Sequence, residues 1–186
     1  MSNQLNLNRL QIIITLIVTT LILSLLLWQH FNAGVPSHHV LQRKDLPEIS
    51  NWLGAIVLPV LTWVLLGRIK KRFGKQGVGY RNQNQNENVK TIRRFIIGLL
   101  LGAALALSFT NNYTWFLDNV LYLLLILGLI VPIFYSEFIL GFVLAMSYTF
   151  GAILPTVFVL IIAAVGLLLF KFLRPLLLKL FSYARG

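Results

Sequence analysis

The sequence predicts an all-α fold in which helices cross a membrane as one polytopic bundle. Of the 186 residues, 58% are hydrophobic and 11% are charged, against about 45–50% and about 25% in an ordinary soluble domain. The apolar residues gather in long runs. The first run, residues 10–28, carries no charge and would span about 30 Å as a helix, the thickness of the hydrocarbon core. The basic residues cluster at the ends of such runs, which is typical of membrane topology.

Six helices account for the apolar runs within a single transmembrane domain, residues 1–186. The first run is too long for the apolar region of a signal peptide, and no small-residue cleavage pattern follows it. We therefore interpret it as a retained helix. The expected helices cover about residues 10–29, 46–67, 94–110, 117–133, 137–150 and 154–173.

The second helix is expected to begin well before its apolar run. Asp45 suits an N-cap, Pro47 suits the first turn, and Glu48 stands three residues after Asp45, as in a capping box. Pro59 falls inside this helix and predicts a kink.

Residues 135–170 carry a single charge and are too long for one span. Gly151 and Pro155 indicate a break between two helices. The fifth helix, residues 137–150, is short, so a re-entrant hairpin is the alternative. Residues 174–186 form a basic tail that is expected to lie along the inner interface.

The basic segment, residues 68–93, orients the bundle. Together with Arg94 it holds nine of the sixteen Lys and Arg residues, and such loops stay cytoplasmic. Its Asn- and Gln-rich part, residues 82–88, predicts flexibility. The glycines at 74, 77 and 79 do not follow the order of a phosphate-binding loop, and they indicate a turn.

With this segment inside, six spans place both termini in the cytoplasm. Fourteen of the sixteen basic residues then fall on the inner side, and only Arg43 and Lys44 fall outside. Five spans would move the C-terminal basic residues outside, against the positive-inside rule. We expect an integral protein of the plasma (cytoplasmic) membrane.

The net charge of +11 does not indicate nucleic-acid binding, because the basic residues lie at the ends of membrane runs instead of on a soluble module. We expect them to attract anionic lipid headgroups. Gly98 and Gly102 form a G-x-x-x-G pattern that favours close helix packing, within the chain, in a homo-oligomer or against a partner subunit.

The predicted outer face collects all three histidines and three of the five acidic residues: His30, His38, His39, Asp45, Glu48 and Asp118. Imidazoles with carboxylates suit a metal or proton site. The candidate site comprises His38, His39, Asp45, Glu48 and Asp118, with His38 and His39 as weak metal ligands. The competing interpretation, which we favour, is that the three acids cap helices and the histidines are ordinary interfacial residues.

The first loop, residues 30–45, is expected to be a structured outer cap. Pro36 stiffens it, and Val35, Val40 and Leu41 suit packing on helix ends.

Glu137 is the remaining candidate, an acid at the inner end of the fifth helix. Charges inside a membrane are costly and often functional. At the interface the cost is small, and Lys171 or Arg174 is an expected neighbour.

The expected function is that of a non-enzymatic membrane component, either small and transporter-like or an accessory subunit of a complex. The chain has no cysteine and no recognisable catalytic pattern, and the sequence identifies no cofactor. One alternative is an enzyme or a metal- or proton-dependent protein that uses the outer-face residues. Another is a path for a neutral solute, lined by the hydroxyls of Thr15, Thr19, Thr20, Ser24, Thr62, Ser108 and Ser147, although such hydroxyls often bond their own helix.

Overall fold

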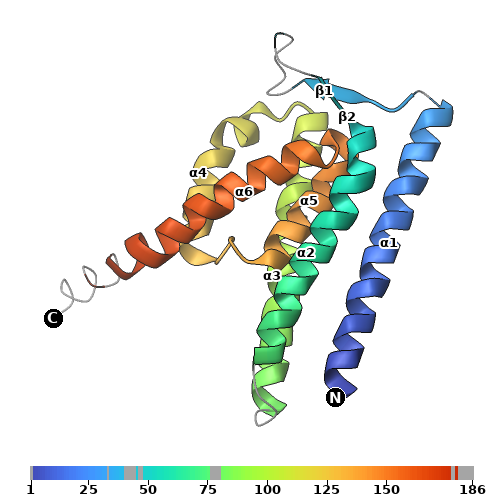
Figure 1. The fold of residues 1–186 in the computed structure, drawn as a ribbon. Coiled ribbons are helices and arrows are strands. Elements are labelled where there is room, and N and C mark those ends of the chain that lie inside the picture. The colour runs from blue at the N-terminus through green and yellow to red at the C-terminus, as the bar shows by residue number, and fades with distance from the viewer. Residues whose placement is uncertain are drawn as a thin grey trace.

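The computed structural model describes residues 2–32, 34–39, 45, 48–75, 81–176 and 179, and the structural statements below concern these residues. They form a helical bundle with one short β-hairpin, so the prediction of an all-α fold is confirmed. Successive helices run in alternating directions (Figure 1). The helices are α1 (Ser2–Asn32), α2 (Gly54–Lys75), α3 (Arg81–Thr110), α4 (Thr114–Ile130), α5 (Ser136–Phe150) and α6 (Ile153–Leu168).

Four stretches of the described residues are long and apolar enough to cross a membrane. They are Asn6–Asn32, Asn51–Phe73, Asn86–Thr110 and Ile153–Leu176. The remaining apolar helices, α4 and α5, are shorter, with 17 and 15 residues. Of the six predicted spans, four therefore meet the length and composition that a crossing requires.

The two ends of the bundle differ in structure. At one, which we call the hairpin end, β1 (Ser37–His39) pairs antiparallel with β2 (Glu48–Ser50), with Ser37 opposite Ser50. At the other, the basic end, α2 ends and α3 begins (Figure 1).

The second helix begins later than the sequence indicated. Glu48 lies in β2 instead of a first helical turn, because β1 supplies backbone partners for this segment. A 3-10 turn, η2 (Asn51–Leu53), follows, and the Ser50 hydroxyl accepts a hydrogen bond from the Trp52 backbone N–H. Ser50, not Asp45, is therefore the residue that caps this helical segment, and α2 proper begins at Gly54.

The basic segment is largely helical, which corrects the expectation of a flexible loop over residues 68–93. Helix α2 continues to Lys75 and α3 already begins at Arg81; residues 76–80 lie outside the described residues. Lys, Arg, Gln and Glu are good helix formers. In addition, Lys90 pairs with Glu87 one turn away, at 2.8 Å, which stabilises an exposed helix by a few tenths of a kcal/mol.

The core is built around α5, which lies among α2, α3 and α6 (Figure 1). Its side chains Phe138, Phe142 and Val143 are at most 1% exposed. The rings of Phe138 and Phe142 stack 6.4 Å apart, centroid to centroid. Helix α5 is therefore the central element on which the other helices pack.

Glycines allow α3 and α5 to pack backbone to backbone. A Cβ at Gly98 would lie 2.2 Å from the Phe138 carbonyl oxygen, and one at Gly102 would lie 2.6 Å from that of Phe142. From the other side, a Cβ at Gly141 would lie 2.3 Å from the Phe95 carbonyl oxygen. Because these contacts advance in the same direction along both helices, α3 and α5 run parallel, and the G-x-x-x-G face packs within the chain.

The turn from α5 to α6 closes the hairpin end of the core. Gly151 adopts a φ of +67°, which favours glycine, and a Cβ there would lie 2.1 Å from the Asn51 Oδ1 atom. Asn51 is buried, and its backbone N–H donates to the Pro36 carbonyl at 3.2 Å. The hairpin, α2 and the α5–α6 turn are thereby joined around one asparagine.

Candidate functional site: a buried arginine–glutamate cluster

Glu137 lies in the first turn of α5, toward the basic end of the core, and its side chain is 1% exposed. A buried carboxylate without a partner would be very costly, so its charge must be compensated. Two arginines from neighbouring helices provide this compensation: Arg72 on α2 and Arg94 on α3. We call Arg72, Thr91, Arg94, Tyr135 and Glu137 the arginine–glutamate cluster.

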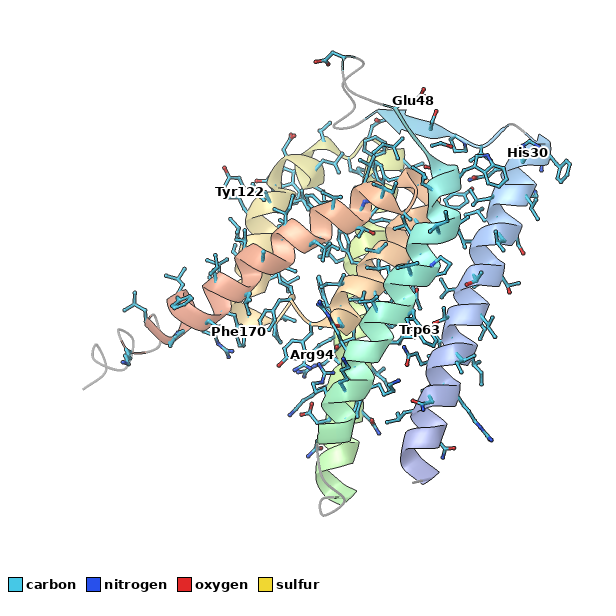
Figure 2. The ribbon with its side chains drawn as sticks, viewed as in Figure 1. His30, Glu48, Trp63, Arg94, Tyr122 and Phe170 are labelled. Atoms are coloured by element: carbon cyan, nitrogen blue, oxygen red, sulfur yellow. The ribbon has the colours of Figure 1, made fainter. Side chains whose placement is uncertain are left out.

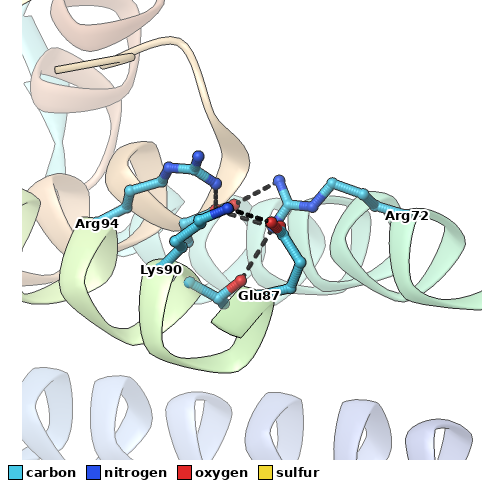
Figure 3. Close-up of polar contacts among 6 residues, drawn as sticks. Arg72, Glu87, Lys90 and Arg94 are labelled. Atoms are coloured by element: carbon cyan, nitrogen blue, oxygen red, sulfur yellow. Dashed lines mark hydrogen bonds and ion pairs between the residues drawn. The ribbon is translucent and has the colours of Figure 1, made fainter. Parts of the chain in front are cut away.

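The contacts within the cluster are direct hydrogen bonds (Figure 3). The Arg72 Nη2 atom donates to Glu137 Oε1 at 2.8 Å, and its Nη1 atom donates to Oε2 at 3.3 Å. The Arg94 Nη1 atom donates to the same Oε1 at 3.0 Å. Arg72 also donates to the Thr91 hydroxyl at 3.1 Å. One carboxylate thus ties α2 and α3 to the start of α5.

The Tyr135 ring supports both guanidinium groups. Its centroid lies 3.9 Å from the Arg94 Cζ atom and 4.9 Å from that of Arg72, distances at which a cation is attracted to an aromatic ring. Tyr135 stacks in turn on Phe134, which meets Phe170 edge to face at 5.6 Å. These rings connect the cluster to the π-helical turn η3 (Leu169–Leu173) that follows α6.

A second ion pair lies beside the cluster on α3. Glu87 binds Lys90, with both side chains more exposed than Glu137 (Figure 3). Among these charged groups, three cations face two carboxylates. The neighbourhood therefore keeps one positive charge in excess.

The sequence located Glu137 but not its partners. Lys171 and Arg174 were the expected neighbours, whereas the ion pairs are made by Arg72 and Arg94. Arg174 instead lies over the Phe170 ring, 4.4 Å from its centroid. A usable signal was present, because a lone acid in an apolar stretch requires cations, and the basic segment holds most of them. The choice of partner depends on which helices pack together, and the sequence does not display this.

The described members of the outer-face candidate lie on different segments of the chain. Glu48 accepts a hydrogen bond from the Ser37 hydroxyl in the β-hairpin. Asp118 is exposed in the second turn of α4 instead of capping that helix. His30 meets the Trp52 ring at 5.9 Å. Figure 2 shows His30 and Glu48 at this end and Arg94 toward the other.

Among the described residues, no three His, Cys, Asp or Glu side chains are grouped as a metal site would require. Asp45 has an interaction of its own. The strand positions of His38 and His39 are defined, but the expectation for their side chains lies outside what the structure describes.

Of the segment expected to form an outer cap, residues 37–39 pair with residues 48–50 in the β-hairpin. Val35 packs against the hydrophobic core, and Pro36 accepts the hydrogen bond from Asn51. Val40 and Leu41 lie outside the described residues. A shallow cleft of about 360 Å³ is lined by Trp28, Gln29, Asn32, Gly34, Val35 and Pro36.

A polar contact that the sequence did not indicate joins α1 to α2. Gln11 is buried, and its Nε2 atom donates to the Trp63 carbonyl at 2.9 Å. Its Oε1 atom accepts from Lys70 at 2.7 Å. Gly67 leaves room for this amide, since a Cβ there would lie 3.3 Å from the Gln11 Nε2 atom.

Several hydroxyls within the helices bond their own backbone. Thr15, Thr19 and Ser147 each donate to the carbonyl one turn earlier, at 2.5–2.8 Å. Such hydroxyls are already satisfied and offer little to a passing solute. Thr62 differs, because its buried hydroxyl has no partner among the described atoms.

Comparison with protein-family models, with curated proteins and with solved structures found no match for this chain.

Proposed function

We propose that this protein is a non-catalytic component of a membrane, an accessory subunit that acts through helix packing with a partner subunit and with lipid. The observation that carries the proposal is the use of Glu137. This carboxylate is engaged by Arg72 and Arg94, so the buried acid at the start of α5 serves to hold helices together.

Together with this function we propose a membrane arrangement. It places the basic end in the cytoplasm, with six crossings and both termini inside. Support comes from the alternating helix directions (Figure 1) and from the concentration of basic residues at one end of α2 and α3. Cytoplasmic segments carry such an excess of Lys and Arg. The plasma membrane is the proposed location.

The outer surface of the bundle fits lipid or a partner helix. On α1, Leu10, Leu16, Leu21 and Phe31 are 52–81% exposed. Exposed apolar surface on this scale is unusual for a soluble protein and common at interaction surfaces. Helix α1 packs mainly on α2, so much of its remaining surface is available for such contacts.

A transporter-like role for the chain alone is the second candidate. The buried hydroxyl of Thr62, which has no partner among the described atoms, favours it, because an unsatisfied polar group inside a bundle is a position at which a polar solute or water gains a hydrogen bond. A transporter-like chain would act without a second protein subunit.

Native mass spectrometry of the tagged full-length protein, extracted from its own membrane in a mild detergent, tests the proposal. We expect a second membrane protein at fixed stoichiometry, together with bound lipid. A chain that is isolated alone and moves a solute in proteoliposomes would contradict the accessory role and support the transporter-like one.

The same measurement on a His38→Ala/His39→Ala variant tests the outer-face alternative. We expect unchanged partner and lipid content and unchanged folding. A stoichiometric metal that is present in the wild type and absent from the double variant would overturn the non-catalytic proposal.

A further inference from the structure

We propose that the arginine–glutamate cluster is a binding subsite for one phosphate group, supplied by an acidic phospholipid headgroup of the membrane leaflet at the basic end. This inference names a lipid contact within the proposed function. It rests on the membrane location and not on the presence of a partner subunit.

The cluster carries more positive than negative charge. Two guanidinium groups share one carboxylate, and the neighbouring Lys90–Glu87 pair is neutral by itself. The side chains of Arg72 and Arg94 are only 25% and 13% exposed, so water screens the excess positive charge incompletely. A second anion beside the arginines would remove this imbalance.

The two arginines have hydrogen-bond donors that no described residue uses. The hydrogen bonds of Arg94 to described residues use Nη1, so most of its five N–H groups have no acceptor among those residues. The Arg72 Nε atom is buried without a hydrogen-bond partner among the described atoms. Guanidinium groups match the geometry of phosphate oxygens and bind them with paired hydrogen bonds.

The cluster is preorganised for an anion. Glu137, Thr91 and the Tyr135 ring hold the two arginines in place before any ligand arrives. A phosphate that binds therefore orders little of the protein, which lowers the entropic cost of binding. A diffuse patch of mobile surface lysines has no such support.

The depth of the cluster along α2 suits a lipid headgroup. Along α2, Arg72 lies about 27 Å from Gly54 at 1.5 Å per residue, close to the thickness of the hydrocarbon core of about 30 Å. The candidate membrane span of this helix reaches Phe73, and its residues from Arg68 onward are mostly basic. The cluster is thus at the level where lipid phosphates lie.

The test is a lipid titration of the full-length protein, delipidated in a neutral detergent and followed by native mass spectrometry. The probes are phosphatidylglycerol, phosphatidylcholine and inorganic phosphate. We expect one phosphatidylglycerol per chain to bind at least about tenfold more tightly than phosphatidylcholine. An equal affinity for the two lipids in the wild type would overturn the proposal without any variant.

Two matched variants separate a built site from general attraction. Arg94→Lys keeps the positive charge but loses the planar guanidinium group, and we expect it to weaken phosphatidylglycerol binding about tenfold. Arg93→Gln removes a charge from the adjacent, exposed position, and we expect a change of less than about twofold. If Arg94→Lys does not fold, Arg72→Lys takes its place, and the wild-type lipid preference remains decisive.

The opposite pattern would be weaker phosphatidylglycerol binding in Arg93→Gln and unchanged binding in Arg94→Lys. It would show general electrostatic attraction and overturn the subsite. Displacement of the bound lipid by millimolar inorganic phosphate would support recognition of a phosphate group, but it would assign the site to the free phosphate ion. A protein without a preference for phosphatidylglycerol could still have a partner subunit. The phosphate subsite and the proposed accessory function can therefore fail independently.

Discussion

Glu137 brings a charge into the apolar core, and two arginines compensate it there. Removing one member of a buried ion pair is more harmful than the net strength of the pair suggests, because the remaining charges are left without a partner. At this site the remaining charges would be the guanidinium groups of Arg72 and Arg94, which lie together over the Tyr135 ring.

Replacing Glu137 by Gln is therefore expected to lower the free energy of unfolding. The loss should be about 2–3 kcal/mol, below the about 3–5 kcal/mol of a fully buried pair because Arg72 is partly exposed. Chemical denaturation in detergent measures it. Asp118→Asn is the matched control, since it neutralises an exposed acid, and we expect a change within about 0.5 kcal/mol. Equal losses in the two variants would contradict the structural role of Glu137.

At the scale of helices, the contact between α3 and α5 depends on glycine. An added methyl group at Gly98 would meet the Phe138 carbonyl at 2.2 Å, a distance that real atoms do not adopt. Neither backbone can move away without disturbing the buried Phe138 and Phe142 rings. The small residues at this interface thus determine how closely α5 approaches the cluster.

We expect Gly98→Ala to destabilise the protein by at least about 1–3 kcal/mol, the usual cost of overpacking a core, despite the better helix propensity of alanine. Gly54→Ala is the control, because a Cβ there would make an ordinary contact of 3.5 Å with the Ala152 Cβ atom. Thermal unfolding in detergent distinguishes the two. Similar melting temperatures would show that α3 and α5 are not packed as described.

Helix positions followed from the sequence because long apolar runs admit few other structures. The boundaries did not follow, and the reasons are local. Helix α2 was placed too early because Glu48 resembles part of a capping box, while the pairing of β2 with β1 joins segments that a loop separates. The basic segment was expected to be flexible because its Asn-rich composition outweighed the helix formers around it.

Only one part of the candidate site, its acid, could be identified from the sequence, and the reason is different. Glu137 is conspicuous as a lone acid, but Arg72 and Arg94 lie 65 and 43 residues away in the chain. Nine basic residues of one segment were equally available as partners. Only the tertiary packing of α2, α3 and α5 selects these two.

At the scale of the whole molecule, the charge distribution predicts an orientation that can be measured directly. The chain has no native cysteine, so single cysteines report without background. Asn111 lies exposed in the turn between α3 and α4, and Lys71 is exposed at the basic end. In intact cells, we expect a membrane-impermeant maleimide to label Asn111→Cys and to label Lys71→Cys only after permeabilisation.

Labelling of Lys71→Cys in intact cells would reverse the proposed orientation. It would also move the phosphate subsite to the outer leaflet. Labelling of both positions from one side would contradict an odd number of crossings between them. The experiment therefore constrains the topology independently of any assumption about function.

The order of the cluster along the chain has a consequence for biosynthesis. A protein emerges from the ribosome with its N-terminal part first, so Arg72 and Arg94 enter the membrane before Glu137 is made. Glu137 stands in the first turn of α5 and is buried in the folded protein, so its charge needs these two cations. Here the finished α2–α3 pair presents two cations and a glycine face to each newly inserted α5. The helices that are made first, α2 and α3, thus provide the surface on which the later helix α5 packs.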